Sequence, residues 1–294
     1  MWIDSFIDYL KFEKCYSEHT ATSYRNDLEN FNLYLEKNQC KCSLEAVTKS
    51  EIRGWIIHLM DNGLKSTSVN RKLSTLKSFY KYLQYKKVIA HNPAWILRGP
   101  EKEKPLPIFI REEAMEKILE KQNSEETFSE TRNRMIIETF YSTGMRLSEL
   151  IGLRMKDVDL HSSVFKVTGK RNKQRLIPFG NELKEHLLHY IRIRNKEFGE
   201  SCCDSFFVLQ NGETMYPSAV YKLVKRELSK VVTLKKRSPH VLRHTFATAM
   251  LNHDASLNAV KEILGHESLE TTEIYTHTTF EELKKVYNQA HPRA

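Results

Sequence analysis

No stretch of this sequence approaches the roughly eighteen consecutive apolar residues that a membrane-spanning helix needs. The N-terminus lacks the basic head and the unbroken apolar core of a signal peptide, because acids stand at Asp4 and Asp8. We therefore expect no spanning helix and no secretion signal, and we expect the protein to stay in the cytoplasm. The chain also has no internal repeat and no low-complexity segment, so a solenoid array is not expected.

Cysteine is scarce, and no two cysteines have the C-x-x-C spacing. Disulfide frameworks and structural zinc sites need paired, suitably spaced ligands, so neither is expected here. We predict free thiols and no structural metal. The five cysteines are Cys15, Cys40, Cys42, Cys202 and Cys203.

Acidic residues are outnumbered: 37 Asp and Glu stand against 46 Lys and Arg, which gives a formal net charge of +9 and a pI near 9.1. This balance favours a polyanionic partner such as nucleic acid, although a membrane surface would fit the charge equally well. A length of 294 residues exceeds one ordinary core. Two domains of about 100 to 200 residues each are therefore expected.

Residues 1–92 contain only helical patterns, with apolar residues three and four positions apart. The fourth of these helices, at about 66–87, has cations on its outer faces, and no Asp or Glu occurs from Asn62 to Pro100. Because a solvated helix face usually mixes both signs, this one-sided charge favours a surface that faces DNA phosphates. The alternative is an ordinary solvated face. The candidate DNA contacts are Lys65, Arg71, Lys72, Lys77 and Lys81.

Proline is concentrated at one place, where four of the eight prolines fall within fifteen residues. Proline removes a backbone donor and disfavours helix at the residue before it, so residues 93–107 are predicted to form an extended linker. Beyond it, residues 108–294 mix helical patterns with two short β-rich runs, 164–167 and 175–178, which predict a hairpin. A further strand-like run lies at 206–209.

Two cations of the C-terminal half have unusual surroundings. Arg146 lies three residues before Glu149, so a carboxylate on the same helix face can hold its guanidinium group. Lys170 falls at the tip of the predicted hairpin, in a basic stretch without acids. An exposed lysine on a turn usually faces solvent, so position alone does not make it functional. The other candidate DNA contacts on this hairpin are Arg171, Lys173 and Arg175.

His240, Arg243 and His244 share one face of a predicted helix because they are three and four residues apart. The spacing does not decide which histidine reacts. An H-x-x-x-H pair could also bind zinc, but no glutamate stands between the histidines as a base, and no residue clearly supplies a third ligand.

His266 follows Gly265, a residue type that commonly ends helices, so it is predicted on a turn between two helices. Tyr275 comes nine residues later on an amphipathic pattern, where a tyrosine is commonly a half-buried core residue. It is also a possible nucleophile. Arg and His donors beside such a tyrosine suit an anionic oxygen, and phosphate is the predicted ligand.

The singled-out residues lie, in order, in the motifs TGMRLSEL, TGKRNKQR, HVLRH, LGH and IYTH. In order and separation these motifs resemble the signature of the tyrosine recombinases, the phage-integrase superfamily, across the whole C-terminal domain. The helical N-terminal domain resembles the core-binding domain of that family. Within this family, the size, the two-domain layout and the ending AHPRA resemble those of the bacterial Xer recombinases.

The resemblance implies a mainly α fold with three parts. A SAM-like four-helix core-binding domain is expected at 1–92, followed by the linker at 93–107. An α+β catalytic domain with a small antiparallel sheet is expected at 108–294. Its last segment, 279–294, resembles the helix that family members donate to a neighbouring subunit, although a frayed terminal helix is the alternative.

The resemblance also implies a mechanism in which a tyrosine attacks the scissile DNA phosphate and forms a 3′-phosphotyrosyl link. Arginines take the role that a metal ion has in polymerases, and the covalent link stores the phosphodiester energy, so neither metal nor ATP is expected. The implied catalytic residues are Arg146, Lys170 (general acid), His240 (base), Arg243, His266 and Tyr275 (nucleophile). Glu149 and His244 are expected to support them.

The implied partner is a double-stranded DNA recombination site, with a tetramer on two such sites. A second Xer recombinase and a septal DNA translocase are possible further partners, in the resolution of chromosome or plasmid dimers. Three alternatives stay open: a mobile-element integrase of the same family, a non-catalytic DNA-binding regulator on this scaffold, and a type IB topoisomerase.

Overall fold

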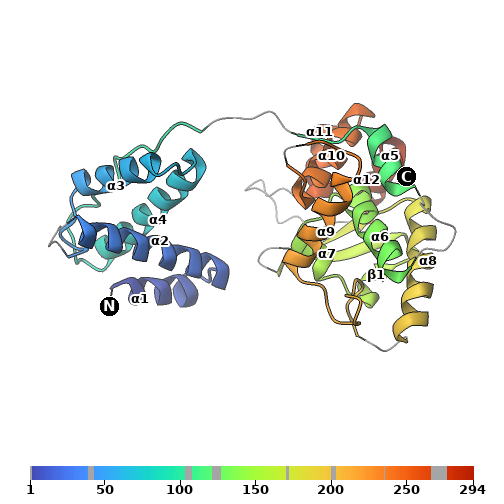
Figure 1. Ribbon diagram of the computed structural model, residues 1–294, viewed down its shortest axis with the longest axis horizontal. Helices are drawn as coiled ribbons and strands as arrows, with labels where there is room; N and C mark the ends of the chain where they lie inside the picture. The colour runs from blue at the N-terminus through green and yellow to red at the C-terminus, as the bar shows by residue number, and fades with distance from the viewer. Residues whose placement is uncertain are drawn as a thin grey trace. The chain divides into compact units, whose positions relative to one another are not determined.

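The computed structural model consists of two compact units, residues 1–105 and 106–294, and each is described by itself (Figure 1). The structure describes residues 2–38, 43–102, 108–120, 127–169, 172–199, 203–234, 236–265 and 277–294; side chains are described for the same residues except 277–279.

The N-terminal unit is helical throughout the part that the structure describes. The Ser17 hydroxyl accepts from the backbone N–H of Thr20 where the second helix begins. A capping box begins the third helix, where the Glu51 carboxylate accepts from the Thr48 backbone N–H at 2.5 Å. The helices are α1 (Trp2–Asp8), the π-helical η1 (Tyr9–Glu13), α2 (Glu18–Lys37), α3 (Lys49–Asp61) and α4 (Ser66–Tyr85).

Aromatic residues fill the core of this unit. Phe31 packs against Trp55 with ring centroids 4.8 Å apart, and Phe6 meets Phe79 edge to face at 5.4 Å. Ala94 and Leu97 are buried in the same core. The first residues of the expected linker therefore pack against the N-terminal unit.

The C-terminal unit is built around α6 (Phe128–Thr143), which is buried on nearly every face and packs against α5, α8, α9 and α10. A capping box at Thr127 and Glu130 begins this helix. The other helices are α5 (Glu112–Leu119), α7 (Leu147–Ile151), α8 (Asn181–Phe198), α9 (Pro217–Ser229), α10 (Pro239–Asn252), α11 (Leu257–Leu264) and α12 (His277–Ala290).

A small antiparallel sheet lies in this unit, in the order β1 (Val158–Asp159), β2 (Val164–Thr168) and β3 (Gln174–Pro178). The predicted hairpin is confirmed, and Asn172 takes a φ of +59° in its turn. Residues 206–209 form no strand; an isolated bridge pairs Val208 with Thr214 instead. The predicted fold class, mainly helical with a small antiparallel sheet, is confirmed.

Helix α12 packs against α10, α11 and β3 of its own unit. Leu283, Tyr287 and Ala290 are buried in the core of the C-terminal unit. The residues after the helix continue this packing, because the His291 ring stacks on Tyr287 and Phe246 at centroid distances of 5.2 and 5.5 Å. In the single chain, the terminal helix thus covers its own core.

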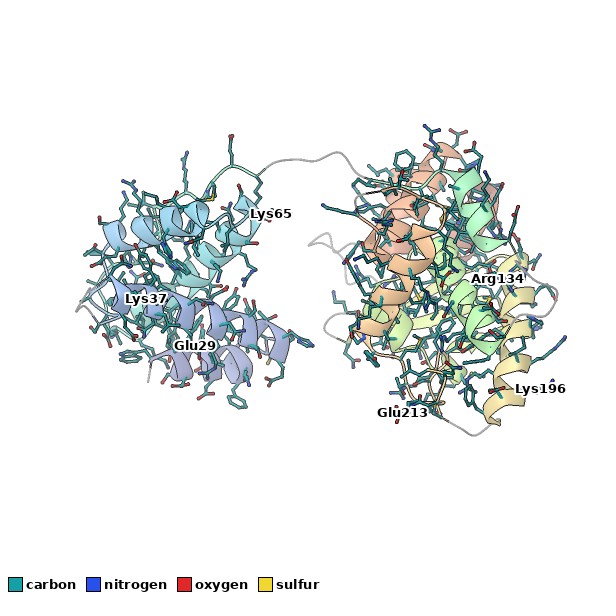
Figure 2. The ribbon with its side chains drawn as sticks, in the orientation of Figure 1. Glu29, Lys37, Lys65, Arg134, Lys196 and Glu213 are labelled. Carbon is teal, nitrogen blue, oxygen red and sulfur yellow. The ribbon has the colours of Figure 1, made fainter. Side chains whose placement is uncertain are left out.

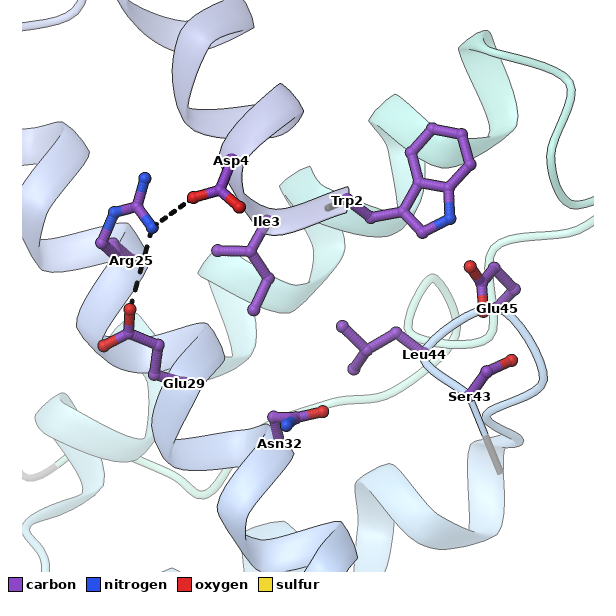
Figure 3. A pocket seen from close by; sticks show the side chains of 9 residues that line it. All are labelled: Trp2, Ile3, Asp4, Arg25, Glu29, Asn32, Ser43, Leu44 and Glu45. Carbon is purple, nitrogen blue, oxygen red and sulfur yellow. Dashed lines mark hydrogen bonds and ion pairs between the residues drawn. The ribbon is translucent and has the colours of Figure 1, made fainter. Parts of the chain in front are cut away.

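A cavity of about 400 Å³ opens on the N-terminal unit between α1, α2 and the segment before α3 (Figure 3). Arg25 lies at its wall and pairs with Asp4 and Glu29. None of the predicted site residues lines it. No helix among the described residues is long and apolar enough to cross a bilayer.

Candidate active site

The site begins where α6 ends. Gly144 caps α6 with a φ of +58°, and a Cβ atom there would lie 2.5 Å from the Phe246 ring, so only glycine fits. The chain then turns so that Arg146 caps α7. Its backbone N–H donates to Glu149 Oε2 at 2.7 Å, and its Nη1 donates to Oε1 at 2.8 Å. The predicted pairing of these two residues is present.

Arg175, from β3, reaches the same carboxylate. Its Nη1 donates to Glu149 Oε1, its Nη2 donates to Oε2 at 3.0 Å, and its Nε donates to the Ile263 carbonyl at 3.2 Å. The Arg175 side chain is only 9% exposed, and the Glu149 side chain is fully buried. A planar guanidinium can make this two-bond contact, whereas an ammonium group cannot.

Arg243, from α10, completes the cluster. Its Nη1 donates to the Gly144 carbonyl at 2.5 Å and its Nη2 to the Leu264 carbonyl at 2.7 Å. Arg146 Nη2 donates to the Gly265 carbonyl at 2.6 Å. Three arginines from three elements therefore converge on the last residues of α11. Gly265 ends α11 with a φ of +63°, which confirms the predicted helix-ending glycine.

The cluster is strongly cationic. Three guanidinium groups against one carboxylate leave a charge of 3 − 1 = +2. Burial alone would raise the pKa of Glu149, but the hydrogen bonds and charge of Arg175, followed by those of Arg146, outweigh it and lower that pKa. Burial, together with the charges of Arg146 and Arg175, lowers the pKa of Arg243 to about 10, so it stays protonated at neutral pH. The arrangement suits a bound anion.

Four predicted site residues, Lys170, Arg171, His266 and Tyr275, lie outside the described residues. Their chain neighbours are nevertheless placed. A Cβ atom on Gly169 would lie 3.2 Å from Glu149 Oε1, so the residue before Lys170 contacts the carboxylate of the cluster. Gly265, the residue before His266, holds Arg146 through its carbonyl.

The two histidines of α10 are both described. Pro239 occupies the first turn of the helix, and His240 and His244 follow as exposed residues one turn apart. Arg243 lies between them in sequence and turns its guanidinium into the cluster. The base role of His240 and the supporting role of His244 stay predictions.

The predicted DNA contacts differ in exposure. Lys65, Lys81 and Lys173 are exposed, and Lys77 is half-buried; Figure 2 shows Lys65 where α4 begins. Arg71, whose side chain is 47% exposed, and the buried Lys72 both bind Asp27 of α2, a buried acid that the local sequence around α4 does not reveal. Arg175 is turned inward, as described above. Their contact with DNA is untested and stays a prediction.

One cluster has the composition of a metal site. Among the described residues, Glu138, Glu182 and His186 bring possible ligand atoms within 4.8 Å of one another. The Arg293 guanidinium pairs with both carboxylates, and His186 Nδ1 lies 2.8 Å from Glu138. The chain's own cation thus occupies this cluster.

The charge of Arg175 and its place on the hairpin predict a DNA contact, whereas its alternation with Ile177 predicts an inward side chain. Residues two apart in a strand share a face, and Ile177 is fully buried. The register agrees, because Arg175 pairs with the buried Val167. The two-residue period of the strand therefore indicates that Arg175 points inward, although its charge suggests an exposed side chain.

Segments of both units match known protein families. The model of the "Phage integrase family" matches residues 109–282, and that of the "Phage integrase, N-terminal SAM-like domain" matches residues 3–87. The chain belongs to the phage integrase family. The predicted resemblance to tyrosine recombinases is confirmed.

Relatives named tyrosine recombinase XerC match along the full chain. The protein of Chlorobaculum parvum is 38% identical and is matched over 100% of this chain and 95% of its own length. That of Staphylococcus aureus is 38% identical, over 99% and 96% respectively. These matches confirm the predicted enzyme class, a tyrosine site-specific recombinase.

Solved structures share the fold. A λ integrase dimer bound to a COC′ core site aligns with a TM-score of 0.71 at 20% identity, over 93% of this chain and 97% of that one. XerH bound to a palindromic difH substrate aligns with a TM-score of 0.71 at 22% identity, over 97% and 93%.

Proposed function

We propose that this chain cuts and rejoins DNA through a covalent link between Tyr275 and a 3′-phosphate. The observation that carries the proposal is the convergence of Arg146 and Arg243 on the turn that precedes His266. Each guanidinium group has five N–H donors, and the described bonds of each occupy only part of them. The remaining donors are available to the non-bridging oxygens of a phosphodiester, where negative charge gathers in the transition state.

The reaction balances without a metal ion. The Tyr275 hydroxyl oxygen forms a bond to phosphorus as the bond to the 5′-oxygen breaks. His240 accepts the phenol proton, and Lys170 donates a proton to the departing 5′-oxygen. In the second half, a 5′-hydroxyl of the partner strand attacks the phosphotyrosine, and the tyrosine regains its proton. The number of phosphodiester bonds is conserved, so no ATP is required.

Within this proposal the N-terminal unit holds the DNA through its exposed lysines, foremost Lys65 and Lys81. We assign the chain to Xer-type resolution of chromosome or plasmid dimers, supported by its relatives named XerC. A tetramer on two DNA sites, a second Xer recombinase and a septal DNA translocase are proposed partners. The proposed location is the cytoplasm, where the chromosome lies.

Donation of α12 to a neighbouring subunit is part of the same proposal. Leaving its present place would expose Leu283 and Tyr287, which are buried in the single chain. Each such exposure costs about 1.5–3 kcal/mol. An equivalent pocket on a neighbour would offset the cost, so exchange is expected only where several subunits assemble on DNA.

A nicked suicide substrate tests the proposal. A recombination site is incubated with the protein in EDTA, and covalent protein–DNA adducts are separated on a denaturing gel. We expect an adduct with the wild type and none with Tyr275→Phe, since the latter has no nucleophile. Tyr221→Phe, at a tyrosine that is 46% exposed, is the control and should react normally. Adduct formation by Tyr275→Phe would contradict the nucleophile assignment. DNA binding without any adduct would favour a non-catalytic regulator.

A further inference from the structure

We infer that Arg175 is a positioning residue that ties the β2–β3 hairpin, whose strands flank Lys170 in the sequence, to the end of α11, which His266 follows in the sequence. The inference rests on the proposed function, because it concerns how two of its catalytic groups are held in register. It also reassigns a residue whose charge and hairpin position predicted a DNA contact.

Arg175 connects the two segments by direct contacts. At one end, its guanidinium holds both oxygens of Glu149, the carboxylate against which Gly169 packs. At the other end, its Nε donates to the Ile263 carbonyl at 3.2 Å. Gly265 also lies directly on the side chain, since a Cβ atom there would be 3.0 Å from Arg175 Cδ. The Arg175 side chain thus binds Glu149, which supports Gly169, the residue before Lys170. It also contacts Gly265, the residue before His266.

The burial of Arg175 separates this role from DNA binding. Three of its nitrogen atoms are engaged inside the protein, and only 9% of the side chain is exposed. Arg146, which shares the same carboxylate, is 37% exposed and faces the proposed phosphate site. The two arginines therefore have different roles. Arg175 fixes the Glu149 carboxylate, and the fixed carboxylate orients the more exposed Arg146.

Loss of Arg175 would leave Glu149 buried with Arg146 as its remaining guanidinium partner. We expect Arg146 to be drawn towards the carboxylate, and the Ile263–Gly265 turn to lose one of its supports. Displacements of about 1 Å in a reacting group can slow chemistry about 100-fold. The affinity for DNA, set mainly by exposed phosphate contacts, should change little.

The experiment compares Arg175→Gln and Arg175→Lys with the wild type in two measurements: the rate of adduct formation at saturating suicide substrate, and the dissociation constant as a function of salt. Arg194→Lys is the matched control, because Arg194 is another buried arginine of this unit that donates to backbone carbonyls, those of Cys203 and Ser205. Thermal melting confirms that each variant is folded.

We expect both Arg175 variants to slow adduct formation about 100-fold, with an unchanged salt slope of binding, while the Arg194 control keeps its rate. The lysine variant keeps the charge but cannot reach both oxygens and the Ile263 carbonyl together. It therefore decides the matter if the glutamine variant does not fold. A wild-type rate in Arg175→Lys, or a lower affinity with a smaller salt slope, would overturn the inference.

A double-mutant cycle with Glu149→Gln adds a measurement that general destabilisation does not mimic. Arg175 acts partly through Glu149 and partly through the Ile263 carbonyl, so its loss should slow the reaction less in the Glu149→Gln background than in the wild type. Multiplication of the two defects would contradict the inference. Failure of the proposed function is recognised separately, because in that case the wild type itself forms no adduct.

Discussion

Two buried carboxylates, Asp27 in the N-terminal unit and Glu149 in the C-terminal unit, each hold two cations, and these two clusters serve different ends. In the N-terminal unit, Asp27 of α2 binds Arg71 and Lys72 of α4, and it also accepts from the Thr75 hydroxyl at 3.0 Å. In the C-terminal unit, Glu149 binds Arg146 and Arg175. Both carboxylates are almost inaccessible to solvent.

The difference lies in what surrounds the carboxylate. The Asp27 cluster joins two neighbouring helices, and its cations use the carboxylate as their main anchor. The Glu149 cluster adds a third arginine and four backbone carbonyls, at Gly144, Ile263, Leu264 and Gly265, as acceptors. Uncharged acceptors orient guanidinium groups without neutralising them. The Asp27 cluster thus joins two helices, whereas the Glu149 cluster keeps a surplus of positive charge.

The largest expected difference between the two clusters is in the rate of adduct formation. Arg243→Ala should slow adduct formation at saturating DNA about 100- to 1000-fold, because it removes a donor from the charge that develops on the phosphate. Arg71→Ala in the other cluster should leave that rate unchanged and weaken binding only. Single-turnover kinetics distinguish the two. An equal slowing by both variants would show that the clusters do not differ as proposed.

The next effect concerns stability. Asp27→Asn leaves the Lys72 ammonium, of which 11% of the side chain is exposed, without its carboxylate. Breaking a buried pair in this way costs about 3–5 kcal/mol. Native-state hydrogen exchange should show that loss at the amides of α2 and α4. Amides of α6, in the other unit, serve as the internal control, and equal loosening there would contradict a local role.

His291, which follows α12, differs from the carboxylates of both clusters because it is buried as a neutral group. Burial lowers the pKa of His291 to about 4, well below its ordinary 6.5. Between these values the unfolded chain binds more protons than the folded one, so stability is present above pH 6.5 and declines towards pH 4. From pH 7 to 5 the loss should be about 2 kcal/mol.

That pH dependence is measured by urea unfolding of the wild type and of His291→Gln, which keeps hydrogen-bonding groups but does not titrate in this range. The variant should be less stable at pH 7 and should lose less on acidification. Parallel pH profiles for the two proteins would exclude His291 as the source.

The smallest effect is expected at the exposed lysines. Lys81→Ala should weaken DNA binding uniformly across sequences and reduce the salt slope by about 1, since one phosphate contact is lost. Lys37→Ala, on the end of α2 and labelled in Figure 2, is a control outside the predicted contact set. Titrations at several salt concentrations compare them, and identical slopes would remove Lys81 from the interface.

Much of the local structure could be predicted because its signals are local. The capping box at Thr48, the hairpin turn at Asn172 and the helix end at Gly265 each depend on a few neighbouring residues, and all three are present. The pairing of Arg146 with Glu149 spans one helical turn and was equally accessible.

Long-range pairings were not accessible in this way. Asp27 is separated by 44 residues from Arg71, and Glu149 by 26 from Arg175. The cations of the basic helix and of the basic hairpin were therefore predicted to face DNA, although some cations of each bind a buried acid from another element. The packing of α12 on its own unit depends likewise on contacts with α10 and β3 that no local pattern encodes.

The central claim is that the arginine cluster acts on the negative charge of a phosphate. It is tested most directly by measuring adduct formation on a suicide substrate whose scissile phosphate is replaced by an uncharged methylphosphonate. The account predicts that the defect of Arg243→Ala, large on the normal substrate, becomes much smaller on the neutral one, because that substrate brings one negative charge fewer for the guanidinium group to hold. An equally large defect on both substrates would contradict it.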